Sequence, residues 1–119
     1  MAAPKRQLAE DGGRESLARV LADRRRQHVV EALDSLDDDV SLGTLVDDIR
    51  ARETREADGR AVDRQTVALS LHHVHLPKLA DAGVLAYDLK RKRVTRDRQR
   101  VSDLLRMAED AYRVLSSEV

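Results

Sequence analysis

The sequence contains no cysteine, phenylalanine or tryptophan, and it has only two tyrosines. Without cysteine the chain has neither a disulfide framework nor a thiolate metal site, and this composition fits a reducing cytoplasm. It also lacks an apolar run of the roughly 20 residues that a membrane-spanning helix needs. Residues 1–6 lead into polar sequence rather than into the apolar segment of a signal peptide. We therefore expect a cytoplasmic protein with an aliphatic core and no membrane contact.

A net charge is also lacking, because 22 basic residues balance 22 acidic ones. Overall charge therefore gives no argument for binding to nucleic acid. The charges are nevertheless segregated along the chain. Residues 31–58 hold ten acidic and three basic side chains, whereas residues 88–100 hold seven basic and two acidic ones. A polyanionic partner would be attracted to the second segment.

The 119 residues give room for one domain with terminal additions. Residues 1–14 predict a flexible N-terminal tail, because they combine proline and glycine with charges. Apolar spacings of three and four predict helix over 15–36, with Asp23 as a candidate N-cap inside it. A very short strand at Val40 and a helix over 42–53, capped by Ser41, are expected to follow.

The third predicted helix covers residues 63–82, with Asp63 as its candidate N-cap. A uniform helical spacing gives it two apolar sides, which predicts that it is packed between neighbours. One side holds Val67, Leu71 and Val74, and the other holds Leu69, Leu76 and Leu79. Pro77 predicts a kink or a new start near His75, and Gly83 predicts a left-handed end.

Residues 84–87 and 93–95 read as two strands around a charged turn, and residues 97–118 as a last helix. Three helices followed by a hairpin are the order of a winged helix-turn-helix. The predicted fold class is therefore mainly α with a small β-hairpin, with a winged domain over 15–96 and a C-terminal dimerisation helix over 97–119. A long apolar stripe on that helix, too large for a small core to cover, predicts a homodimer. The stripe residues are Val101, Leu104, Leu105, Ala108, Tyr112 and Leu115.

The segment from His75 to Asp88 is similar to the end of the third helix and the first wing strand of arsenic-repressor-type winged helices. Those proteins share the pattern His-Leu-x-x-Leu-x-x-Ala-Gly-Leu/Val. The chain more closely resembles an uncharacterised haloarchaeal winged helix-turn-helix family, in which Arg-Arg-Arg opens the first helix and His-Leu-Pro-Lys-Leu-x-x-Ala-Gly-Val follows. Here these motifs are residues 24–26 and 75–84. The resemblance covers about residues 20–95 and implies a winged-helix fold but no particular activity.

The basic hairpin predicts contact with DNA phosphates, since a tight turn concentrates positive charge at a tip. The alternative is that the tip is charged for solubility. Further candidates for phosphate contact lie on the first and third helices, although the arginines of the first helix have an alternative as partners of the acidic second helix. The phosphate candidates are Arg24, Arg25, Arg26, Lys78, Lys90, Arg91, Lys92 and Arg93.

The polar stripe of the third helix offers Thr66, Ser70 and His73 for contact with base edges. It contains none of the arginine, asparagine or glutamine side chains that make the strongest bidentate base contacts, so direct readout is expected to be weak. The favoured function is a transcriptional regulator that binds double-stranded DNA through the third helix and the basic wing. The alternative is a winged-helix protein–protein interaction module without DNA binding.

Metal binding and catalysis are the remaining functional classes. His72, His73 and His75, with His28, raise a metal-sensing interpretation, but such sites need three or four converging ligands. A structural or DNA-facing role is favoured for them, and no metal or cofactor is expected. The sequence has no glycine-rich phosphate loop, nucleophile–histidine–acid set or zinc-hydrolase motif, so an enzyme is not expected.

Overall fold

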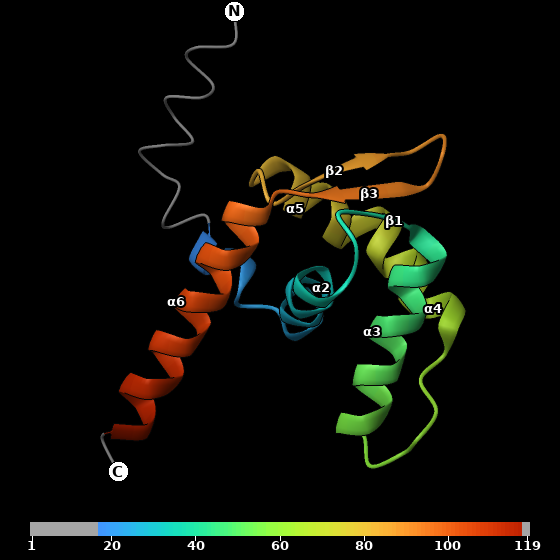
Figure 1. The fold of residues 1–119 in the computed structure, drawn as a ribbon. Coiled ribbons are helices and arrows are strands. Elements are labelled where there is room, and N and C mark those ends of the chain that lie inside the picture. The colour runs from blue at the N-terminus through green and yellow to red at the C-terminus, as the bar shows by residue number, and fades with distance from the viewer. Residues whose placement is uncertain (1–16, 118–119) are drawn as a thin grey trace, which may run out of the picture.

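The computed structural model describes residues 17–117, and its elements follow the order of a winged helix (Figure 1). The predicted fold class is confirmed: the chain is mainly helical, with a small antiparallel sheet and a C-terminal helix. The predicted tail, residues 1–14, lies outside the described residues. The elements are α2 (Arg24–Ser35), β1 (Asp39–Ser41), α3 (Leu42–Glu56), α4 (Arg64–Ser70), η1 (Leu71–His75), α5 (Leu76–Asp81), β2 (Leu85–Asp88), β3 (Arg93–Arg96) and α6 (Arg98–Ser117). Within residues 17–117, no helix combines the length and the apolarity needed to cross a membrane.

Three side chains cap the helices at the positions that the sequence predicts. Asp23 accepts a hydrogen bond from the backbone amide of Arg26 at the start of α2. At the start of α3, Ser41 accepts a hydrogen bond from the amide of Thr44. At the start of α4, Asp63 accepts one from the amide of Thr66. Each cap satisfies an amide that has no carbonyl partner in the first helical turn. Local sequence therefore fixes where these helices begin.

The sheet has three antiparallel strands in the order β1-β3-β2. The short strand expected at Val40 is present and pairs with Val94 of β3. The expected hairpin forms from β2 and β3, with Tyr87 opposite Val94. Val40, Leu85 and Val94 are buried, so one face of the sheet closes the core while the hairpin loop projects beyond it.

The third helical segment contains a π-helical turn, η1, between α4 and α5. The amide of Leu76 bonds the carbonyl of Leu71, five residues earlier, which is the spacing of a π turn. Pro77 then occupies the first turn of α5, where an amide donor is not needed. The predicted new start near His75 is therefore confirmed.

The extra residue in this turn changes which side chains face the core. Leu76 and Leu79 are fully buried together with Val67 and Leu71, because the spacing of five from Leu71 to Leu76 returns the chain to the same side. Leu69 and Val74 are instead 51% and 43% exposed. The expectation that both sides of this segment are buried is wrong, since it assumed uniform α-helical spacing.

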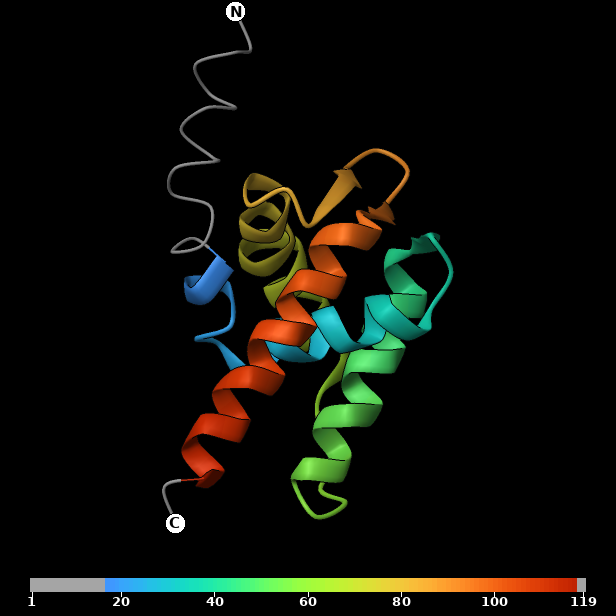
Figure 2. The same ribbon diagram turned by 60° about the vertical axis from the view of Figure 1, so that its left-hand side comes forward.

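The last helix, α6, divides into two parts with different surroundings. It crosses α2, and in its N-terminal half Val101 and Leu104 are buried in the core of their own domain (Figure 2). The assignment of these two residues to a dimer interface is therefore wrong. Leu105 and Ala108 are half-buried, whereas Tyr112 is 75% exposed. The side chain of Leu115 lies outside the described part of the structure.

Candidate nucleic-acid interface

The outward side of α4 and η1 presents a mixed polar and apolar stripe. Thr66 and His73 are exposed and Ser70 is half-buried, so the three predicted base-contact residues lie on or beside this stripe. The hydroxyl of Thr66 donates to Asp63, 2.7 Å away, which ties it to the helix cap. His73 stacks edge-on against His72, with 4.8 Å between the ring centroids. Lys78 is exposed further along, on α5.

A hydrogen bond joins this helical segment to the wing. The Tyr87 hydroxyl lies 2.6 Å from Nδ1 of His72, and the two rings meet edge-on. Burial raises the pKa of Tyr87 above its ordinary value of 10.0, so its hydroxyl keeps its proton at neutral pH. Because Tyr87 belongs to β2, the contact fixes the wing relative to the outward stripe.

The wing tip is organised by one carboxylate and one left-handed residue. Asp88 accepts hydrogen bonds from the amides of Lys90 and Arg91, and Lys92 has a φ of +53°. The carbonyl of Lys92 accepts from the amide of Leu42, the first residue of α3. Backbone contacts thus hold the tip in place. The side chains of Lys90, Arg91 and Lys92 are exposed and have no ion-pair partner within residues 17–117.

Arg93 differs from the three cations at the tip. Its guanidinium pairs with Asp39 at 2.8 Å and bonds the Asp39 carbonyl, so it connects β3 to β1. Both side chains are about half exposed, and such pairs contribute little to stability. Arg93 follows the tip directly in the sequence, and its Nε and Nη2 are engaged by Asp39.

The outward stripe, the tip and the start of α3 lie at one end of the domain. Leu42 at the start of α3 bonds the tip, and Arg64 at the start of α4 pairs with Asp47 of α3 at 2.7 Å. The N-terminal turn of α3 therefore lies between the wing tip and the beginning of α4.

The three arginines that open α2 are occupied within the chain. Arg24 pairs with Glu56, and Arg25 binds Glu53 through two nitrogens at 2.6 and 2.7 Å. Arg26 turns the other way and bonds the carbonyl of Val20 and Nδ1 of His75. Of the two alternatives for Arg24 and Arg25, the structure has the pairing with the acidic second helix, which is α3. We therefore leave all three out of the candidate interface.

Removing the Arg24 guanidinium should be visible in the titration of Glu56. The pKa of Glu56 is lowered from 4.5 to about 2, first by the hydrogen bond from Arg24 and then by that from His28. A lowered carboxyl pKa stabilises the fold above about pH 4.5, and this contribution is lost as pH falls towards 2. In Arg24→Ala the carboxyl resonance of Glu56 should titrate nearer 4.5 by NMR. An unchanged titration would show that the pair does not form in solution.

The four histidines do not come together as the ligands of one metal ion in the described part of the structure. His72 faces Tyr87, His73 is exposed, and His75 is buried beside Arg26. His28 lines the same cavity as His75, and its Nε2 lies 3.1 Å from Glu56. Burial lowers the pKa of His75, which keeps its ring neutral. Within the described residues, no group of three or more histidine, aspartate and glutamate side chains is arranged to hold a metal ion.

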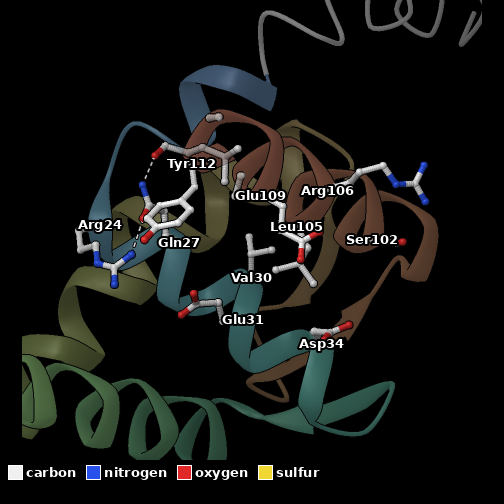
Figure 3. Close-up of a pocket in the computed structure, with 13 residues that line it drawn as sticks. Arg24, Gln27, Val30, Glu31, Asp34, Ser102, Leu105, Arg106, Glu109 and Tyr112 are labelled. Carbon is white, nitrogen blue, oxygen red and sulfur yellow. Dashed lines mark hydrogen bonds between the residues drawn. The ribbon is translucent and has the colours of Figure 1, made fainter. Parts of the chain in front are cut away.

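An apolar groove runs between α2 and the exposed half of α6 (Figure 3). Val30 of α2 and Leu105 of α6 face each other across its floor, and Tyr112 lies at one end. Glu31 and Asp34 border it along α2. Three of the predicted dimerisation residues, Leu105, Ala108 and Tyr112, line this groove.

The fold is that of a winged helix, and its wing tip carries three cations that have no ion-pair partner among residues 17–117. The chain belongs to the family described as "Domain of unknown function (DUF7344)", whose model matches residues 18–95. This match ends at β3, so the family domain comprises α2 to the wing. No curated protein and no solved structure gives a significant match to the chain.

Sequence reasoning missed three exposed residues of this surface. The predicted set of base-contact residues omits Gln65, which the structure exposes in the first turn of α4. Its position just after the Asp63 cap is the available signal, because the first turns of a recognition helix are where bases are contacted. Leu69 and Val74 were assigned to buried sides, and only the π turn reveals their exposure.

Proposed function

We propose that this protein is a transcriptional regulator that binds double-stranded DNA as a homodimer in the cytoplasm. The observation that carries the proposal is the wing tip, where Lys90, Arg91 and Lys92 are exposed and have no ion-pair partner in the described part of the chain. Cations held by a fixed backbone are suited to phosphates, since binding releases condensed counterions without first breaking internal ion pairs.

This arrangement supports separate roles for two parts of the surface, one in contact with phosphates and the other with base edges. The wing tip would hold phosphates, which positions the domain without reading sequence. The stripe on α4 and η1 would then enter the major groove, with Gln65, Thr66, Ser70 and His73 near base edges. Gln65 adds the bidentate side chain that the predicted set lacked.

The homodimer is supported by the exposed half of α6. Tyr112 is 75% exposed at one end of the apolar groove, on the part of α6 that continues past its own core. A second copy of α6 in this groove would cover Leu105 and Ala108. Two-fold pairing would place two wings on one duplex, in successive half-sites about one helical turn apart.

Binding of the full chain to duplex DNA across a salt series tests the proposal. We expect the logarithm of the association constant to fall linearly with the logarithm of salt concentration between about 50 and 300 mM. Fluorescence anisotropy with a labelled random-sequence duplex measures this. The absence of binding at about 50 mM salt would contradict the proposal and favour the alternative, a protein–protein interaction module.

A further inference from the structure

Among the described residues, two large apolar side chains are exposed on the helical segment that is proposed to enter the major groove. Five large apolar residues are exposed among those described, and two of them, Leu69 and Val74, lie on the outward stripe of the third helical segment. A third, Leu89, belongs to the wing tip, next to Lys90. Single exposed apolar residues are common on soluble proteins. Two such residues on one stripe of the same helical segment favour a partner with an apolar group at that surface.

The two residues occupy positions from which a groove-bound helix meets base edges. Leu69 lies one turn before His73, and Val74 lies one turn after Ser70. They are therefore interleaved with the polar residues proposed to face the bases. A ligand that approaches Ser70 and His73 cannot avoid contact with them.

The major groove of DNA offers one apolar group at the edges of its normal bases, the C5-methyl of thymine. The cations at the wing tip supply the charge complementarity that makes a duplex the fitting partner. We infer that Leu69 and Val74 contact thymine methyl groups and so give the protein a preference for thymine at particular positions. This inference rests on the proposed function and names the base chemistry that it uses.

Uracil differs from thymine only by the missing methyl, which makes it the direct probe. A preferred duplex is first selected from a random pool with the full-length protein. Each thymine in it is then replaced singly by uracil, and affinity is measured at one salt concentration. We expect about a fourfold loss at one or more positions, the value of one buried methyl group.

Variants assign that loss to the helix. In Leu69→Ala and Val74→Ala, the ratio of the affinities for the thymine duplex and the uracil duplex should fall towards one at the position that each residue contacts. Both side chains are largely exposed, so these variants are expected to fold. Leu89→Ala is the matched control, because it removes an exposed apolar side chain from the wing tip and should keep the difference.

The outcomes separate this inference from the proposed function. Salt-dependent duplex binding that is insensitive to uracil at every position would overturn the inference and leave the proposed function standing. The same holds if the uracil effect persists in both helix variants, since it would then come from duplex shape. Failure to bind any duplex at low salt would overturn both.

Discussion

Replacing Lys90, Arg91 and Lys92 together by alanine is expected to weaken DNA binding by roughly 100- to 500-fold per bound protomer at about 0.1 M salt. Each neutralised phosphate contributes about 0.9 to the slope of log affinity against log salt, so the slope should fall by about 3 per bound protomer. The three side chains have no ion-pair partner within residues 17–117, and Asp88 and the Lys92 carbonyl hold the turn through backbone atoms. The fold should therefore survive the change.

A matched control separates local charge from net charge. Arg55→Ala, Arg60→Ala and Arg113→Ala together remove the same charge from the end of α3, the loop that follows it and the C-terminal half of α6. These segments lie at the end of the domain opposite the wing (Figure 1). This control should leave the salt slope unchanged. Anisotropy titrations at several salt concentrations measure both variants. Equal losses in the two would mean that overall charge, and not the wing, drives binding.

The second large effect is expected from Leu104→Ala, which should lower the free energy of unfolding by about 2–5 kcal/mol. Leu104 is fully buried where α6 crosses α2, so the truncation leaves a cavity in the domain core. Urea unfolding followed by circular dichroism at low protein concentration measures this. A fully stable Leu104→Ala variant with lost self-association would return Leu104 to a dimer interface.

Tyr112→Ala should have the opposite effect: weaker self-association with little change in the stability of the monomer. Tyr112 is exposed in the single chain, so its removal should change the stability of the monomer by less than about 0.5 kcal/mol. If α6 pairs with a second copy, a buried tyrosine is typical of the residues that dominate an interface, and self-association should weaken about 30-fold or more. Sedimentation velocity over a concentration series measures it. Unchanged association in Tyr112→Ala would contradict the proposed use of this half of α6.

The order of elements and the starts of the helices could be predicted because their causes are local. Asp23, Ser41 and Asp63 cap amides only three residues away, and Pro77 acts on its own helix. The basic hairpin is likewise a local pattern, since its charges are consecutive and its turn is held by Asp88. These features depend on contacts within a few residues and are therefore readable from sequence.

The composition of the candidate interface depended on contacts between distant parts of the chain. Arg25 and Glu53 are 28 residues apart, and no local pattern distinguishes a guanidinium bound to a carboxylate from one free for phosphate. The π turn also depends on tertiary packing. Leu76 and Leu79 pack in the core only with the five-residue spacing of this turn, and the same spacing leaves Leu69 and Val74 exposed.

The amino-acid sequence by itself determined the winged-helix order, the helix caps and the position of the cationic turn. Only the tertiary structure decided which cations remain unpaired, which apolar residues face outward and which half of α6 belongs to the core. The physical reason is that ion pairing and burial are properties of two surfaces brought together, whereas capping and turn formation are properties of one short segment.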